Sequence, residues 1–114
     1  MMELREKIID DIYVIEVSGR LDTITSKDLE YRLNNLIEQD KAKIVIDLAA
    51  VDYTSSVGLR VLLAALKKQK EKQRTLKLAS MQPFVKDIFR VTGLDRIFSI
   101  YSTQEDAIRN DDPR

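Results

Sequence analysis

The sequence predicts a single α/β domain in which a mixed, largely parallel sheet of about four to five strands packs against about four helices. Short β-branched runs alternate with longer segments whose apolar residues recur at helical spacing, in the order β-β-α-β-α-β-α-β-α. The chain has 114 residues, of which 44% are hydrophobic and 33% are charged, a balance typical of one packed core with a charged surface. We assign residues 1–109 to this domain and residues 110–114 to a flexible C-terminal tail.

The first half of the chain predicts a hairpin, a helix and a central strand. The alternating apolar pattern over residues 8–17 predicts two strands that turn at Asp10-Asp11. A helix should follow, with Thr25 or Ser26 as its N-cap. The β-branched run at 43–48 predicts a strand that is covered on both faces. The apolar face of the helix is formed by Leu29, Leu33, Leu36 and Ile37.

The second half predicts two further strands and three helices. One helix begins near Ser56, and a short alternating strand follows at 75–79. Pro83 and Gly93 have the positions of a first helical residue and a C-terminal glycine cap. A last strand is expected at 97–101, before a terminal helix capped by Ser102. The helix from Ser56 has an apolar stripe formed by Leu59, Leu62, Leu63 and Leu66.

The composition excludes several classes of function. The chain has no Cys and no His, which removes disulfides, thiolate nucleophiles, histidine bases and the usual zinc sites. Lys plus Arg and Asp plus Glu both number 19, so no basic excess points to a nucleic-acid partner. The segment from Met1 to Asp11 does not resemble a signal peptide, and the longest apolar stretch is too short to span a bilayer. We therefore expect a cytoplasmic protein without a membrane, metal or cofactor partner.

Two loops before helices are the candidate functional segments. In the segment from Asp47 to Arg60, a strand ends, a short loop follows, and Ser55 and Ser56 stand at the start of a helix. Such loops beyond the carboxyl ends of strands are where α/β sheets place function, although either serine could simply cap the helix. Asp22 precedes the first helix and is open to the same two interpretations. Neither a phosphate-binding loop nor a serine hydrolase fits, because the Walker pattern and a histidine base are missing.

Four short motifs in order resemble the STAS domain family, in particular its stand-alone bacterial anti-sigma factor antagonists. Gly19-Arg20-Leu21-Asp22 is similar to the family's Gly-x-[Leu/Ile]-Asp, and Asp47-Leu48 with Val51 is similar to Asp-Leu-x-x-Val. The run from Ser55 to Leu59 stands at the place of Asp-Ser-[Ser/Thr]-Gly-Leu, and the run from Phe89 to Leu94 resembles Leu-Phe-x-x-[Ser/Thr]-Gly-Leu. The chain departs from the pattern at Ser55, where the family has aspartate, and at Val57.

The resemblance implies a regulatory binding module and not an enzyme. Its unphosphorylated form would bind an anti-sigma factor that is also a serine kinase, and so free a sigma factor for transcription. Phosphorylation of Ser56, or less favourably of Ser55, would end that binding, and a serine phosphatase would restore it. Two alternatives stay open: a STAS module of another partner-switching, scaffold or transport complex, and a small-ligand binder or enzyme that uses Asp22, Asp52 and Ser56.

The expected partner surface surrounds Ser56. We expect Val57, Arg60 and Val61 to be exposed beside this serine, because the apolar stripe of the helix is wider than one sheet contact needs. The full set of expected partner-binding residues is Asp22, Thr23, Thr54, Ser55, Val57, Gly58, Arg60 and Val61.

Overall fold

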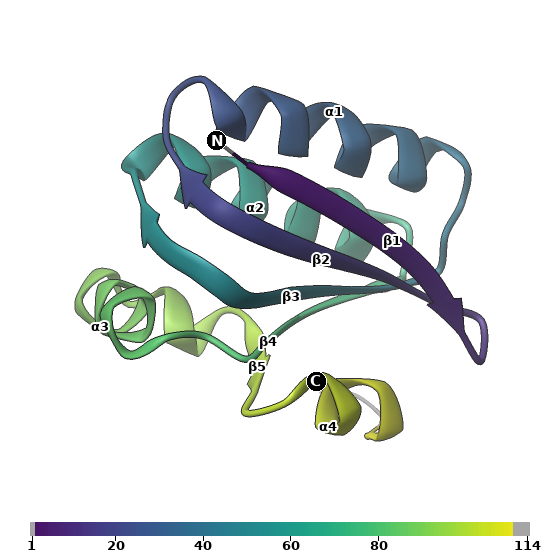
Figure 1. Cartoon of the computed structure of the whole chain (residues 1–114). Coiled ribbons are helices and arrows are strands. Elements are labelled where there is room, and N and C mark those ends of the chain that lie inside the picture. Colours follow the sequence, from purple (N-terminus) through teal and green to yellow (C-terminus); the bar gives the residue numbers. More distant parts are fainter. Residues whose placement is uncertain (1, 111–114) are drawn as a thin grey trace.

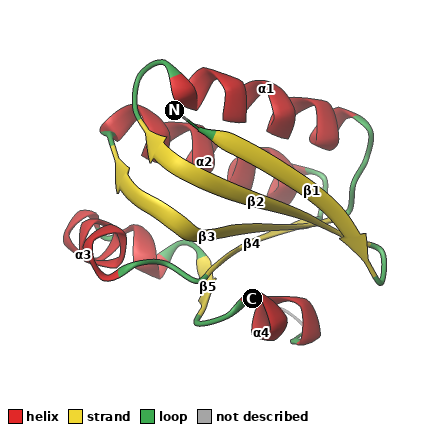
Figure 2. Cartoon of the chain, in the orientation of Figure 1, coloured by secondary structure: helices red, strands yellow, loops and turns green. Residues whose placement is uncertain are grey.

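The computed structural model describes residues 2–110, which form one five-stranded sheet in the order β1-β2-β3-β4-β5 (Figures 1 and 2). Strand β1 pairs antiparallel with β2, and the other neighbouring strands pair in parallel. The predicted α/β class and element order are therefore confirmed. The elements are β1 (Glu3–Ile9), β2 (Ile12–Leu21), α1 (Thr25–Glu38), β3 (Lys43–Thr54), α2 (Ser56–Glu71), β4 (Thr75–Ala79), α3 (Pro83–Thr92), a 3-10 turn (Leu94–Arg96), β5 (Ser99–Tyr101) and α4 (Gln104–Arg109).

The hairpin between β1 and β2 turns at the two aspartates where the sequence predicted a turn. Asp10 and Asp11 have φ angles of 50° and 68°, the left-handed region that aspartate tolerates better than most residues. The turn fixes the β1–β2 register, in which Glu3 lies opposite Ser18.

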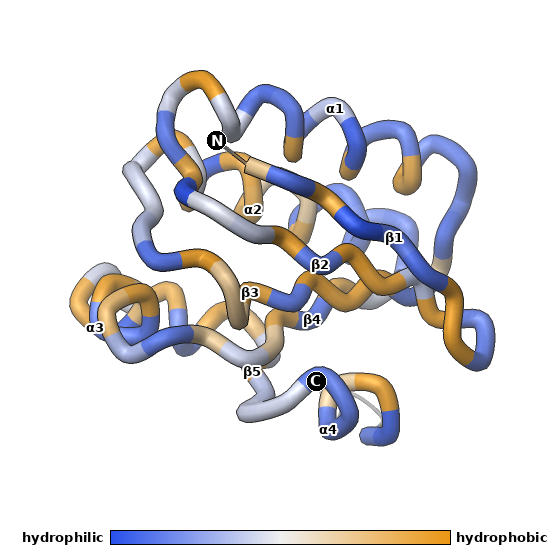
Figure 3. Tube along the Cα trace, in the orientation of Figure 1, coloured by the Kyte–Doolittle hydropathy of each residue, from blue (hydrophilic) through white to orange (hydrophobic). Residues whose placement is uncertain are grey.

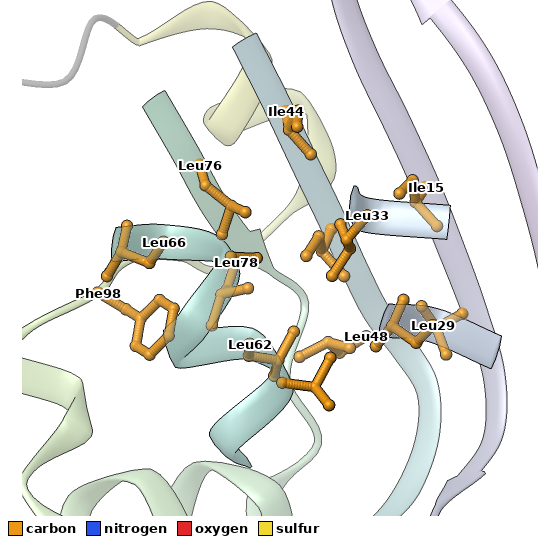
Figure 4. Packing of buried hydrophobic residues seen from close by; sticks show 14 of the residues in the cluster. Ile15, Leu29, Leu33, Ile44, Leu48, Leu62, Leu66, Leu76, Leu78 and Phe98 are labelled. Carbon is orange, nitrogen blue, oxygen red and sulfur yellow. The ribbon is translucent and has the colours of Figure 1, made fainter. Parts of the chain in front are cut away.

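The main core lies between the sheet and the helices α1 and α2, which cover one of its faces (Figure 1). Hydrophobic turns of α1 point toward the sheet and hydrophilic turns point away from it (Figure 3). Figure 4 shows leucines of both helices in contact with the apolar side chains of the central strands. A smaller cluster on the opposite face lies under α4 and is formed by Ile12, Val14, Val45, Ala79 and Ala107. Within residues 2–110, no helix has the length and apolar character needed to cross a bilayer.

Strand β3 is twice as long as the predicted run at 43–48, so the expectation of a loop after that run was wrong. The strand continues to Thr54 because β2 continues to Leu21 and pairs with it along its whole length. The register shifts twice on the way, after Glu16 and after Gly19. These register shifts break the alternation of buried and exposed residues, so the sequence pattern does not reveal that the strand continues beyond residue 48.

Two predicted helix caps were also wrong. No side chain of Thr25 or Ser26 caps α1; instead the carboxylate of Asp22 accepts from the backbone N–H groups at the start of the helix. Helix α4 is capped by Thr103 rather than by Ser102. The caps of α3 are as predicted, with Pro83 in its first turn and Gly93 at φ 78°. Of the predicted tail, Asn110 is hydrogen-bonded to Asp106, and residues 111–114 lie outside the described part of the chain.

Candidate functional site

The two adjacent serines at the start of α2 have different roles. Ser55 is the N-cap residue, with extended backbone, and its Oγ accepts a hydrogen bond from the Gly58 N–H at 3.4 Å. Ser56 is the first helical residue, and its side chain is exposed and makes no hydrogen bond within residues 2–110. Of the two serines that could cap the helix, Ser55 is therefore the cap, and the hydroxyl of Ser56 remains accessible.

Three residues of the expected partner surface are buried, and the expectation that Val61 is exposed was wrong. Thr54 is 4% exposed and Val61 is 7% exposed, and Gly58 is also buried. Val61 faces the sheet because it continues the stripe that begins at Gly58 and includes Leu62. These residues hold α2 against the sheet, and the apolar side chains of α2 that are partly exposed are Val57, Leu59 and Leu63.

Gly58 is needed at this position for packing. A Cβ atom there would lie 2.4 Å from Thr54 Oγ1 and 3.0 Å from Leu21 Cβ. Real Cβ atoms do not approach that closely, so only glycine lets the first turn of α2 rest on the ends of β2 and β3. The close approach fixes the position of Ser56 relative to the sheet.

The other expected residues lie together at one end of the molecule. The Ser55 N–H donates to the Leu21 carbonyl at 2.7 Å, which joins the end of β2 to the start of α2. The loop between β2 and α1 therefore lies beside the start of α2 (Figure 1). Thr23, Ser56 and Arg60 are exposed, and Asp22, Ser55 and Val57 are partly exposed. We call these residues the Ser56 surface: Asp22, Thr23, Ser55, Ser56, Val57 and Arg60.

Asp22 shapes the loop on this surface. Its Oδ1 accepts from the backbone N–H groups of Ile24 at 3.0 Å and Thr25 at 2.9 Å, and from the Thr25 hydroxyl at 3.1 Å. These bonds, with the Thr25 N–H the largest cause, lower the pKa of Asp22 below the usual value for aspartate. The turn and capping role is thus confirmed for Asp22. Its second oxygen, Oδ2, forms an ion pair with Arg20 Nε at 3.8 Å.

Aromatic and apolar side chains extend the surface in a way that sequence patterns did not indicate. The Arg20 guanidinium lies 4.6 Å from the ring centroid of Tyr53, and Phe84 stacks against the same ring at 6.4 Å. Phe84 and Ile24 are 55% and 77% exposed. Phe84 lies in the first turn of α3, and its exposure depends on how that helix lies against the end of β3. Exposed aromatic and arginine side chains are typical of protein-binding surfaces.

Comparison with known proteins decides the family. The STAS domain family model matches residues 3–107. The chain belongs to the STAS domain family. It is 30% identical to BtrV of Bordetella bronchiseptica, a candidate anti-sigma factor antagonist, over 93% of this chain and 91% of the relative.

Solved structures agree with this family. An anti-sigma factor antagonist from Mycobacterium paratuberculosis superposes with a TM-score of 0.88 at 30% identity, and the match covers 95% of this chain and 92% of that chain. SpoIIAA of Bacillus in its phosphorylated form has a TM-score of 0.73 at 19% identity, with 95% and 96% covered. The second likeness shows only that the fold is shared. Among residues 2–110, no group of three or more acidic side chains is arranged to hold a metal ion.

Proposed function

We propose that this protein is an anti-sigma factor antagonist that is controlled by phosphorylation of Ser56. In its unphosphorylated form it binds an anti-sigma factor serine kinase in the cytoplasm, and a sigma factor is released. Phosphorylation of Ser56 ends the binding, and a serine phosphatase restores it. The observation that carries the proposal is the exposed Ser56 hydroxyl, which has no capping role because Ser55 caps α2.

The fold should tolerate a phosphate at Ser56. A phosphoserine adds roughly −1.5 to −2 charges. At the first position of α2 these charges meet free backbone N–H groups and the positive end of the helix dipole, an interaction of about 0.3–1 kcal/mol when exposed. The cap from Ser55 to Gly58 is not disturbed, because the phosphate is added to a different side chain. The phosphorylated form of SpoIIAA, which has the same fold, is consistent with this tolerance.

Binding should be far more sensitive than folding. The same charge, if buried without a matching partner at an interface, costs about 2–5 kcal/mol. Since about 1.4 kcal/mol corresponds to a tenfold change in affinity, a loss of a hundredfold or more is reachable without unfolding. The partly exposed Val57 beside Ser56 would add to this cost, since apolar contacts exclude the water that would otherwise solvate the phosphate.

Ser55 fits the proposal although the family has aspartate there. Ser and Asp are about equally good N-cap residues, so the hydroxyl of Ser55 replaces the structural part of the carboxylate. What is lost is one negative charge beside the site of phosphorylation. We infer that the cognate kinase does not depend on that charge. Ser55 is the less favourable phosphosite because its Oγ is already engaged with the Gly58 N–H.

The first test is to isolate the protein with its bound partners from its own cells and map its phosphorylated residues by mass spectrometry. We expect phosphate on Ser56 and a captured protein with an ATP-binding kinase domain. Phosphate on Ser55 alone, or on no residue, would contradict the switch. Capture of transport proteins without a kinase would instead favour another role for the STAS domain.

The second test uses variants against the kinase captured in the first. Ser56→Asp should weaken binding by a hundredfold or so and leave the melting temperature unchanged or slightly raised. Ser56→Ala should bind like the wild type and accept no phosphate. Thr103→Asp places the same charge at the cap of α4 and serves as the matched control, which should bind normally. Tight binding by Ser56→Asp would overturn the proposal.

A further inference from the structure

The outer edge of β1 is a second surface, separate from the Ser56 surface. Strand β1 is seven residues long and pairs only with β2 within the described chain, so one row of its backbone N–H and C=O groups has no strand partner (Figure 1). The strand at the other edge, β5, has only three residues. A long open edge is a template for pairing with another strand.

An apolar groove runs beside this edge on the helix side. Leu4 and Met2 are only partly buried there, and Tyr31 of α1 is 65% exposed. Together with Asp28 and Arg32 these side chains line a groove of about 360 Å³. On the opposite face of the strand Glu3, Arg5 and Lys7 are exposed. An added strand would therefore meet apolar groups on one face and charges of both signs on the other.

We propose that β1 pairs antiparallel with β1 of a second copy of this chain, around a two-fold axis that passes through Leu4. The pairing joins the two sheets into one continuous sheet, with the α1 and α2 layers of both copies on the same face.

The charge pattern of β1 selects this register. When the helix layers of both copies lie on one face of the joined sheet, two residues that are opposite each other must point to the same face of their own sheets. Even-numbered residues are then opposite even-numbered ones and odd-numbered residues opposite odd-numbered ones, so the two-fold axis passes through a single residue position. With the axis at Leu4, each Glu3 lies opposite Arg5 of the second copy, and Leu4 meets its own copy at the apolar groove. An axis at Arg5 would pair each Glu3 with Lys7 of the second copy, but it would oppose two arginines and place the apolar Leu4 opposite the Glu6 carboxylate. An axis at Glu6 would oppose two glutamates and would also place Arg5 opposite Lys7. Like charges directly opposite each other destabilise a strand pair.

The proposed dimer leaves the Ser56 surface open. That surface is formed by the loop after β2 and by the start of α2, and not by the outer edge of β1. Because the paired strands are antiparallel, the two Ser56 surfaces face opposite ends of the joined sheet. Dimer formation is thus independent of partner switching, and each can fail experimentally without the other.

Charge reversal tests the pairing. Analytical ultracentrifugation of the wild type over a range of concentrations should give a mass that rises to twice that of the chain. Glu3→Arg and Arg5→Glu should each give monomers, because each places like charges opposite each other. The double variant restores opposite charges and should dimerise again. A wild type that stays monomeric at its highest soluble concentration, or a double variant that is no better than the single ones, would overturn the proposal.

A cysteine tests the register itself. The chain has no native cysteine, so Leu4→Cys introduces a single thiol. Two residues on the axis of an antiparallel pair have Cα atoms about 4.5–5.5 Å apart, within the range that a disulfide spans. On oxidation with diamide, Leu4→Cys should form a covalent dimer at dilute concentrations. Ile8→Cys is exposed on the same strand but has no opposing residue in this register, and should not. Equal cross-linking of both variants, or none, would overturn the register.

Discussion

Ser55 and Ser56 are adjacent in sequence, yet they have unequal effects on the fold. The Oγ of Ser55 satisfies one of the free N–H groups at the start of α2, and that of Ser56 points into solvent. A free N–H group costs little at an exposed helix end where water can reach it, so the loss of the cap should be measurable but moderate. Capping and phosphate acceptance can thus be separated by single substitutions.

We expect Ser55→Ala to lower the free energy of unfolding by about 0.5–2 kcal/mol, the usual effect of losing an N-cap. Ser56→Ala should change it by less than about 0.5 kcal/mol, as for other exposed positions. Urea denaturation of both variants measures the difference. Ser55→Asp is the control and should match the wild type. A larger loss in Ser56→Ala than in Ser55→Ala would show that the cap is wrongly assigned.

Gly58→Ala should destabilise the protein although alanine is the better helix former. The added methyl group would lie 2.4 Å from Thr54 Oγ1, and overpacking of this kind costs about 1–3 kcal/mol. Thermal unfolding measures the loss. Thr54→Ala removes the oxygen that would clash, so the double variant should recover part of the stability that Gly58→Ala loses. If Gly58→Ala alone were as stable as the wild type, the close approach of α2 to the sheet would be refuted.

At the scale of elements, the short helix α4 is held to the sheet by polar groups at both ends. Near its start, Gln104 Nε2 donates to Glu16 Oε2 at 2.9 Å and to Asp47 Oδ2 at 2.6 Å. Near its end, the buried Lys77 donates to the Ala107 carbonyl at 3.1 Å. A helix of six residues is too short to be stable alone, so these contacts and the small apolar cluster beneath it keep it folded.

Gln104→Ala should therefore loosen α4 and leave the main core intact. Glu16 and Asp47 lie opposite each other in the sheet, and without the bridging amide their carboxylates would repel each other, with only the ion pair from Lys7 to Glu16 left to offset the repulsion. We expect faster hydrogen exchange at the backbone amides of α4 and unchanged exchange in α2, measured by mass spectrometry or NMR. Glu105→Ala is an exposed control on the same helix. Unchanged exchange in α4 would mean that the amide bridge does not hold the helix.

At the scale of the whole molecule, the positive and negative charges balance. The carboxylates of the protein set how its stability depends on pH. Burial by itself would raise the pKa of Glu6, but hydrogen bonds from Arg32 and Tyr13 and the charge of Arg32 outweigh it and lower the pKa. The Asp40 pKa is lowered chiefly by the hydrogen bond from Arg74. A group whose pKa is lowered in the folded state stabilises the fold at neutral pH and loses that effect as the pH falls through its folded pKa.

Stability should accordingly be nearly constant between about pH 5.5 and 7 and fall below about pH 4. The plateau follows because the chain has no histidine to titrate in that range. Urea denaturation at a series of pH values measures both parts of the curve. Glu6→Gln should flatten the acid part, since it removes one of the carboxylates with a lowered pKa. A marked change in stability between pH 5.5 and 7 would contradict the prediction.

The sequence by itself determined the class and order of the elements, because the periods of hydrophobic residues differ between helices and strands. The run at 43–48, the turn at Asp10-Asp11, and the cap residues Pro83 and Gly93 are local signals, and local signals are read without knowledge of the fold. The position of Ser55 and Ser56 at a helix start was predicted in the same way.

The tertiary structure alone decided what packs against what. That β3 reaches Thr54, that Gly58 and Val61 are buried, and that Phe84 reaches solvent beside Tyr53 depend on contacts between segments far apart in sequence. The spacing of apolar residues shows which residues share a face of a helix or strand, but it does not show which face a neighbouring element covers. At the start of α2 the ends of β2 and β3 cover the face that sequence patterns left open. For that reason the serines could be found from the sequence, and the surface around them could be found only in part.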